Sequence, residues 1–168
     1  MGALDEKTGP EGEVSSVAEP PLSVSQASVD DKGRLKLPSE FLAYLEGTKV
    51  TRVFITMLDG RMARIYPVAI WRLNEQLFKN AGANASAAAR LAFRARVYGG
   101  ESDIDKSGRV LMPAKLREEL SLERQPVWLE AHNDGINVMN RSVFDARLQE
   151  STGTSAADLE TMVSMGMR

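Results

Sequence analysis

Two short basic segments hold the side chains best suited to binding a charged ligand. In the first, Lys32 lies in a turn, and Arg34 and Lys36 follow it at intervals of two residues. Residues two apart share one face of a strand, so Arg34 and Lys36 point to solvent and the intervening leucine points to the core. An arginine can donate two hydrogen bonds to guanine O6 and N7, and lysines suit phosphates. The spacing therefore fits a turn and strand that enter the major groove of DNA.

The same residue types also fit a structural role. Asp30 can form an ion pair with Arg34, and Asp105 can do the same with Arg109. Such pairs would brace each turn without any ligand, and the glycine inside each turn would supply the positive φ that the turn needs. The spacing alone leaves both interpretations open.

The pattern occurs twice in the chain. Residues 30–38 read Asp-Asp-Lys-Gly-Arg-Leu-Lys-Leu-Pro, and residues 105–113 read Asp-Lys-Ser-Gly-Arg-Val-Leu-Met-Pro. Aspartate, glycine, arginine and proline recur at one constant offset of 75, and the Asp-Gly pair at 59–60 recurs at 134–135. An internal repeat predicts two copies of one module, and so two copies of whatever it binds. Because about 75 residues is small for an independent core, we expect the copies to pack together or to share strands.

Composition excludes several kinds of chemistry. The 168 residues include no cysteine and one histidine, which argues against thiolate catalysis, disulfides and zinc sites. The sequence also lacks a glycine-rich phosphate loop, so we expect neither an enzyme nor a cofactor. No apolar run approaches the roughly 18 residues of a membrane span, and the acidic N-terminus has no signal-peptide core. A cytoplasmic protein without membrane contact is expected.

Charge is unevenly distributed along the chain. The net charge is −2, with −4 in residues 1–21 and −1 in residues 151–168, which leaves +3 for residues 22–150. The repeat region is therefore mildly basic, and any surface for a polyanion must be local.

Short strands and helices must position these residues. Gly, Pro, Asp and Asn at turns indicate where each strand or helix begins and ends. In the first repeat, strands are expected at 22–25, 34–37, 50–58 and 62–66. Ser39 is expected to cap a short helix that stops at Gly47, and Pro67 to open a second helix. In the second repeat we expect a strand-turn-strand at 101–113, a helix at 114–120, strands at 126–131 and 136–139, and a helix at 142–149. Trp71, Trp128 and Phe144 are expected in the core.

Two further segments flank or join the repeats. Residues 85–97 predict an alanine-rich helix, and Arg90 and Arg94 lie on one face of it. Those arginines fit a phosphate clamp, a subunit contact or a solvated face. Residues 151–168 predict a frayed tail with one helical turn near 157–163. The resulting layout is a disordered acidic leader at 1–21, repeat one at 22–80, a helical connector at 81–100, repeat two at 101–150 and the tail at 151–168.

The doubled Asp-x-x-Gly-Arg-x-x-x-Pro, with its Asp-Gly hairpins, resembles the MraZ family over residues 22–150. The resemblance implies two SpoVT-AbrB modules of the swapped-hairpin type. Together they would form one α+β, β-rich domain, barrel-like and pseudo-two-fold, with peripheral helices.

The resemblance also implies a function and a set of site residues. MraZ proteins are bacterial transcriptional regulators that bind short direct repeats in DNA upstream of the cell-division and cell-wall operon. They act as ring-like homo-oligomers, so double-stranded DNA and further copies of the chain are the expected partners, and the nucleoid the expected location. The predicted DNA-binding residues are Lys32, Gly33, Arg34, Lys36, Lys106, Ser107, Gly108 and Arg109. Secondary candidates for DNA or subunit contact are Arg90, Arg94, Lys115 and Arg117.

Some features depart from that family's pattern. Repeat two has Ser107 where repeat one has Lys32, the overall charge is acidic, and Pro21 and Ser23 stand where a Phe-x-Gly element is usual. The second hypothesis is therefore an oligomeric interaction module of the same fold that no longer binds DNA.

Overall fold

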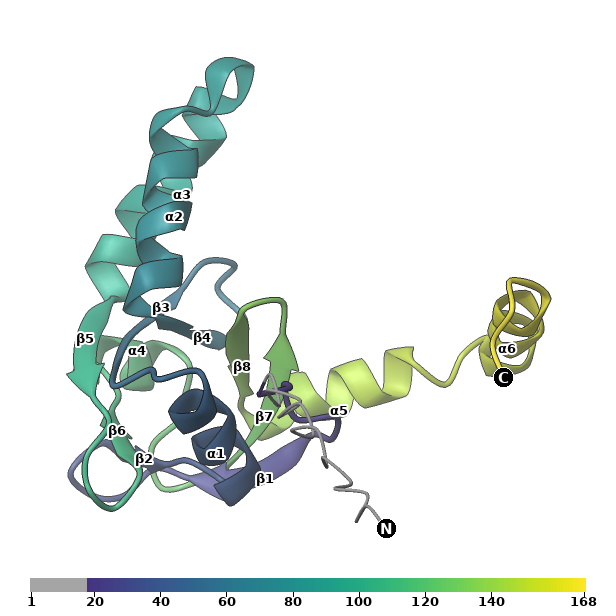
Figure 1. Ribbon diagram of the computed structural model, residues 1–168, viewed down its shortest axis with the longest axis horizontal. Helices are drawn as coiled ribbons and strands as arrows, with labels where there is room; N and C mark the ends of the chain where they lie inside the picture. The colour runs from purple at the N-terminus through teal and green to yellow at the C-terminus, as the bar shows by residue number, and fades with distance from the viewer. Residues whose placement is uncertain (1–17) are drawn as a thin grey trace, which may run out of the picture.

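The computed structural model describes residues 18–168, so residues 1–17 of the predicted leader lie outside the described part (Figure 1). The fold is α+β and strand-rich, as the sequence predicts. The strands are β1 Ser25–Ser28, β2 Arg34–Lys36, β3 Arg52–Met57, β4 Ala63–Pro67, β5 Gly100–Asp103, β6 Arg109–Leu111, β7 Pro126–His132 and β8 Gly135–Met139. The helices are α1 Ser39–Gly47, α2 Val68–Lys79, α3 Ala85–Tyr98, α4 Ala114–Glu119, α5 Arg141–Glu150 and α6 Ser155–Ser164, with a 3-10 turn at Gly82–Asn84.

Strands of the two predicted repeats interleave. The large sheet has the order β1-β7-β8-β4-β3-β5, with every pair antiparallel. β1 comes from the first repeat and pairs with β7 of the second, while β5 of the second pairs with β3 of the first. The copies therefore share strands, as expected. The sheet ends at β1 and β5, so no closed barrel forms within residues 18–168.

A second, two-stranded sheet joins the equivalent strands of the repeats. β2 pairs antiparallel with β6, and Leu35 lies opposite Val110. Both of these side chains are fully buried, as are Leu37 and Met112 just beyond the strands. The predicted alternation is therefore confirmed, and one face of this ribbon is part of the core. Burying each such side chain contributes about 1.5–3 kcal/mol, which fixes which face of the ribbon is exposed.

Several predicted element boundaries are wrong. Pro67, expected to open the second helix, is instead the last residue of β4, and α2 begins at Val68. The first strand begins at Ser25, not Leu22, because pairing with Pro126–Leu129 selects Ser25–Ser28, and Leu22 is fully exposed. Ser39 is the first residue of α1 and not its cap. Pro38 precedes it in extended backbone, and its carbonyl accepts from the N–H groups of Phe41 and Leu42.

Aromatic side chains attach helices to the sheet. Trp71 of α2 is buried and stacks on Phe54 of β3, with ring centroids 4.7 Å apart. Trp128 and Phe144 stack at 4.6 Å but are only half-buried, so they join α5 to β7 outside the main core. The core prediction is confirmed for Trp71 and is only partly right for the other two.

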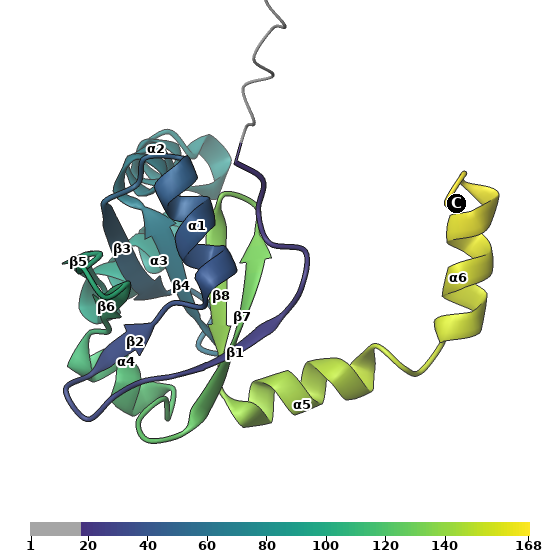
Figure 2. The same cartoon turned by 60° about the horizontal axis from the view of Figure 1, so that its bottom comes forward.

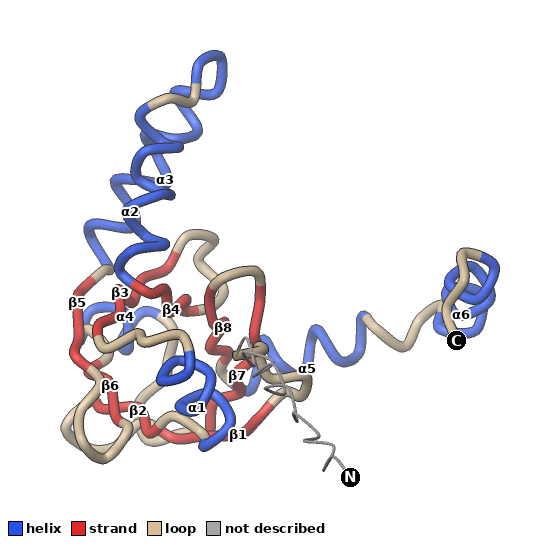
Figure 3. Tube along the Cα trace, in the orientation of Figure 1, coloured by secondary structure: helices blue, strands red, loops and turns tan. Residues whose placement is uncertain are grey.

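Two helical extensions project from the body. α2 and α3 form a hairpin that rises from the sheet, and the chain leaves a different side of the body through α5 (Figures 1 and 3). Beyond α5, α6 stands clear of the body in both orientations (Figure 2). The predicted single turn near 157–163 is a ten-residue helix, Ser155–Ser164.

Candidate nucleic-acid interface

The first basic turn is closed by the side chain of Asp30. One carboxylate oxygen, Oδ1, accepts from the backbone N–H groups of Lys32 at 3.0 Å and Arg34 at 2.9 Å. The other oxygen pairs with Nε of Arg34 at 3.0 Å. Gly33 donates its N–H to the Asp30 carbonyl and has φ +80°, a conformation that favours glycine. The turn thus holds the Arg34 guanidinium through Nε and leaves its two terminal nitrogens without an ion pair among the described residues.

The second turn has the same backbone geometry. Asp105 Oδ1 accepts from the N–H groups of Ser107 at 2.8 Å and Arg109 at 2.9 Å. Gly108 donates to the Asp105 carbonyl and has φ +73°. The side chain of Arg109, however, forms no ion pair within residues 18–168. The two turns therefore differ in how firmly they orient their arginine.

Hydrogen bonding makes both turn aspartates stronger acids. The pKa of Asp30 is lowered, mainly by the backbone N–H of Arg34, and the Arg34 guanidinium adds to this effect. The pKa of Asp105 is lowered mainly by the backbone N–H of Arg109. Both carboxylates therefore stay ionised at neutral pH and keep the turns closed.

The ribbon of β2 and β6 presents its polar face to solvent between the two turns. Lys36 lies directly opposite Arg109, and Arg34 lies opposite Leu111. Like charges in direct opposition repel one another in an antiparallel pair, so the Lys36–Arg109 pair creates a local positive potential. Lys36 Nζ donates to the carbonyl of Ser107. Figure 3 shows the loops of both turns at the same corner of the molecule, beside β2 and β6.

Each turn is supported by the other repeat. The carbonyl of Gly33 accepts from the N–H of Met112 at 2.9 Å, and the carbonyl of Gly108 accepts from the N–H of Leu37 at 3.0 Å. These two bonds are equivalent under the offset of 75. They tie the turns to the ends of the ribbon, so the basic face is held on a rigid support.

Helix α4 of the second repeat also packs beneath the first turn. A Cβ at Gly33 would collide with the guanidinium of Arg117, and a Cβ at Gly108 would lie 2.6 Å from Leu42 Cδ2 in α1. Residues 42 and 117 are themselves 75 apart. Each turn glycine therefore packs against the equivalent helix residue of the other repeat: Gly33 against Arg117, and Gly108 against Leu42.

The predicted primary residues all lie on the ribbon or its turns. Lys32, Lys106 and Ser107 are exposed at the turns, Arg34 and Arg109 are half-buried at the starts of β2 and β6, and Lys36 is exposed. Leu111 was missed by the sequence reasoning, although it is 52% exposed on the same face. The strand alternation around Val110 would have found it, because residues on either side of a buried position point outward.

The secondary candidates lie elsewhere and have other contacts. Arg94 donates to the carbonyl of Leu58 at 2.7 Å, while Arg90 is exposed on α3. Lys115 sits over the ring of Tyr98, with Nζ 5.6 Å from its centroid. Arg117 Nε donates to the carbonyl of Met112 at 3.0 Å.

Residues 18–168 hold no group of three or more acidic or histidine side chains placed to bind a metal ion. In the same part of the chain, none of the helices has the length and apolar character needed to cross a membrane.

Comparison with known proteins gives one consistent result. No protein-family model matches the chain. A protein of Acidobacterium capsulatum is 31% identical over 139 residues, which cover 83% of this chain and 94% of that protein. A protein of Salinispora arenicola is 33% identical over 148 residues, covering 87% of this chain and 99% of the relative. A third, from Pediococcus pentosaceus, is 30% identical over 144 residues, covering 83% and 94%. All three are named transcriptional regulator MraZ.

Proposed function

The chain belongs to the MraZ family of transcriptional regulators, and from this premise we propose that it binds DNA sequence-specifically through the β2–β6 ribbon and its two turns. Its sites would be short direct repeats upstream of the cell-division and cell-wall operon. A ring-like homo-oligomer would present one ribbon to each repeat.

The observation that carries this proposal is the exposed basic face of the ribbon. Arg34, Lys36 and Arg109 lie on the face opposite the buried Leu35 and Val110. The major groove is about 12 Å wide and admits a two-stranded ribbon. A phosphate-lined groove would also relieve the repulsion between the opposed Lys36 and Arg109.

The proposed roles follow from the chemistry of each side chain. Arg34 and Arg109 donate to guanine O6 and N7, and Asp30 presents the Arg34 guanidinium in a fixed orientation. Lys36 and the turn lysines, Lys32 and Lys106, contact phosphates and set the register. Leu111 supplies the apolar contact that a thymine methyl requires.

Oligomerisation is part of the proposal because one ribbon offers few charges. Useful affinity for DNA usually needs about 6–10 phosphate contacts, and one chain offers fewer on this face. Several ribbons on one assembly would engage tandem repeats at high effective concentration.

The test is a DNA-binding titration at two salt concentrations, with DNA from upstream of the organism's own cell-division operon. We expect salt-sensitive, probe-specific binding by the wild type. Arg34→Ala and Arg109→Ala should each weaken specific binding roughly tenfold or more, the loss of one bidentate guanine contact. Arg61→Ala removes an exposed arginine from the β3–β4 turn and should leave binding unchanged.

A second candidate function is an interaction module of this fold without DNA binding. It is favoured by the ion pair that already engages Arg34 and by Ser107 in the place of a lysine. A well-folded oligomer that retards no promoter fragment at low salt would support this alternative and overturn the first.

A further inference from the structure

Helix α6 carries an uncovered apolar face. Leu159, Met162 and Val163 are 53%, 45% and 56% exposed. They follow a spacing of three and four residues, so they lie on one side of the helix. An isolated helix of ten residues is marginal in water, and most helices are stabilised by packing of the apolar face. The helix therefore needs a partner surface that its own body does not provide (Figure 2).

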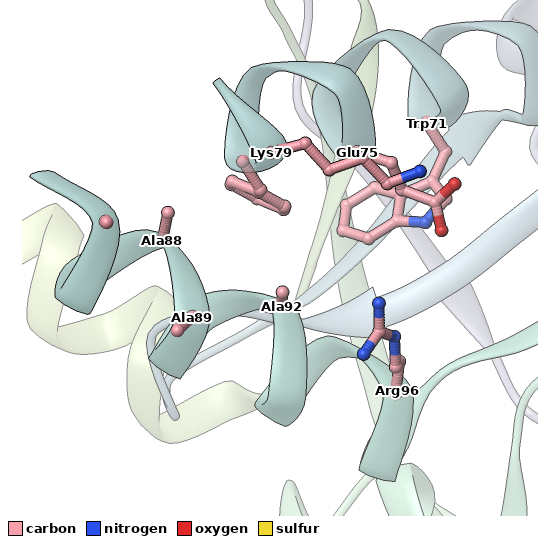
Figure 4. Close-up of a pocket in the computed structure, with 9 residues that line it drawn as sticks. Trp71, Glu75, Lys79, Ala88, Ala89, Ala92 and Arg96 are labelled. Carbon is pink, nitrogen blue, oxygen red and sulfur yellow. The ribbon is translucent and has the colours of Figure 1, made fainter. Parts of the chain in front are cut away.

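The α2–α3 hairpin contains a cavity that suits such a helix. A cavity of about 260 Å³ opens between the two helices. Figure 4 shows the indole of Trp71 on the α2 side and Ala88 and Ala92 on the α3 side, facing the same space. Phe78 completes the lining on α2. The lining is aromatic on the α2 side and consists mostly of alanine on the α3 side, so a bulky aliphatic side chain can enter between the two helices.

The cavity also carries uncompensated positive charge. Lys79 and Arg96 line it, and neither forms an ion pair within residues 18–168. The one acidic residue in the lining, Glu75, is already paired with Arg72 at 3.0 Å. Arg96 rises from α3 toward the cavity (Figure 4).

Helix α6 has the complementary charge pattern. Successive residues are rotated by about 100° around a helix, so Asp158 and Glu160 flank Leu159 on its two sides. The described helix Ser155–Ser164 contains no basic residue. Its apolar stripe is thus bordered by carboxylates, as the cavity is bordered by cations.

We propose that α6 of one copy docks in the α2–α3 cavity of a second copy of this chain. Leu159 and Met162 pack against Trp71 and Phe78, and the flanking carboxylates face Lys79 and Arg96. This inference rests on the proposed ring-like oligomer and names the surfaces that build it. The donor helix and the cavity lie on different sides of the molecule (Figure 1), so the contact is head-to-tail and can close a ring.

A second apolar depression is less suited to this helix. It is lined by Val24, Phe144 and Leu148, but the charges at its edge, Glu130 and Arg147, pair with each other at 2.6 Å. Because Arg147 is already paired with Glu130, this surface has no unpaired cation at its edge for the carboxylates of α6.

The absence of cysteine from the chain permits a direct test. Ala92→Cys in one preparation and Met162→Cys in another are mixed under mild oxidation, without DNA. We expect a disulfide-linked dimer that contains one copy of each variant. Leu73→Cys is the matched control, because Leu73 is exposed on α2 but does not line the cavity. Equal or stronger cross-linking through Leu73→Cys, or none through Ala92→Cys, would overturn the proposal.

Charge exchange provides an independent readout by sedimentation equilibrium. Lys79→Glu with Arg96→Glu should weaken self-association tenfold or more, and so should Asp158→Lys with Glu160→Lys. A mixture of the two variants should associate again, because the charges are complementary once more. Arg61→Glu reverses one charge of the same sign on the β3–β4 turn, half the change in the cavity variant, and should have no effect. Unchanged self-association in all these variants would contradict the docking of α6. That result would leave DNA binding by the ribbon unaffected, because the DNA titration tests it separately.

Discussion

At the scale of single residues, the two turn glycines should be far less replaceable than a third glycine of similar φ. Gly33, Gly60 and Gly108 have φ values of +80°, +75° and +73°. A Cβ at Gly60 meets nothing within 4 Å, whereas one at the other two meets Arg117 or Leu42. Gly60→Ala should therefore cost only the backbone strain, about 1 kcal/mol, and the other two should cost about 2–3 kcal/mol because a neighbour must also move.

Urea denaturation of the three alanine variants measures this difference. Equal losses of stability in all three would show that the close approach of Arg117 and Leu42 has no energetic consequence. DNA binding by folded Gly33→Ala or Gly108→Ala should fall as well, since the turn would no longer present its arginine in the same position.

The turn aspartates should make stability depend on pH in the acid range. Because the pKa of Asp30 and of Asp105 is lowered in the folded state, each carboxylate stabilises the fold above its ordinary pKa of 3.8. That contribution is lost as the pH falls below 3.8 and through the lower folded pKa. The double variant Asp30→Asn with Asp105→Asn keeps an oxygen that can accept the turn hydrogen bonds but loses the charge.

We therefore expect the free energy of unfolding of the wild type to exceed that of the double variant at pH 7. The gap should shrink progressively below pH 4. Urea titrations of both proteins between pH 7 and pH 2.5 give the comparison. A gap that stays constant across this range would mean that the carboxylate charge does not stabilise the turns.

At the scale of elements, the ribbon shows which features the sequence predicts and which it does not. The alternation of Leu35 and Lys36 predicts a half-buried strand, and its buried face is confirmed. The same alternation does not predict the partner strand, because periodicity is a local signal and β2 pairs with a strand about 75 residues away. The offset between copies supplied the only signal, since equivalent strands of a doubled module can meet about a two-fold axis.

Helix starts show a second limit. Serine is a common cap, so the sequence predicts Ser39 in that role. Pro38 occupies the cap position instead, because its fixed φ and extended backbone place its carbonyl at the start of the helix. Local propensity ranks residue types as helix caps. The residue at which α1 begins is set instead by where the ribbon of β2 and β6 ends.

Helix α4 should tolerate leucine better than alanine at residue 117. The side chain of Arg117 is 15% exposed, and it packs beneath Gly33, where the equivalent residue of the other repeat is Leu42. Arg117→Leu loses the hydrogen bond to the Met112 carbonyl, about 1 kcal/mol, and the solvent-facing ion pair with Glu123, but keeps an apolar side chain in the same space. Arg117→Ala loses the packing as well and should cost about 2–3 kcal/mol in total.

Thermal or urea unfolding of the two variants separates the contributions. A leucine variant as unstable as the alanine variant would show that the guanidinium, and not the volume of the side chain, supports the turn. Titration with promoter DNA should follow stability of the turn in both variants, because we assign Arg117 to support and not to contact with DNA.

At the scale of the whole molecule, the interleaved strands explain why the two repeats form one body. β1 and β5 each complete the half of the sheet that belongs mainly to the other repeat. The small size of each copy predicts this sharing, but the family resemblance implied a barrel-like domain, whereas the sheet is open within residues 18–168. Closure depends on whether β1 and β5 meet across the molecule, and no local pattern encodes that distance.

The tail was the least predictable part of the molecule. Residues 151–154 contain Gly153 and hydroxylated side chains, which suggest an irregular end, and the apolar residues beyond them predict only one helical turn near 157–163. The ten-residue helix that follows buries none of its side chains. Its apolar spacing therefore does not mark a face that packs on the core of the same chain.

Removing the tail should therefore separate assembly from DNA recognition. A chain that ends after Glu150 lacks α6 but keeps every residue of the ribbon and of the core, so its thermal unfolding should match that of the full chain at dilutions where neither self-associates. On DNA with a single repeat, we expect the truncated and full chains to bind within about twofold of each other. On DNA with four tandem repeats, the full chain should gain about 10²–10⁴ in affinity from effective concentration, and the truncated chain almost none.

Arg34→Ala in the full chain is the opposite control, because it should weaken binding to both DNAs. If the truncated chain gained as much from tandem repeats as the full chain, α6 would not connect the subunits, and cooperation would have to arise elsewhere in the assembly or in the DNA itself.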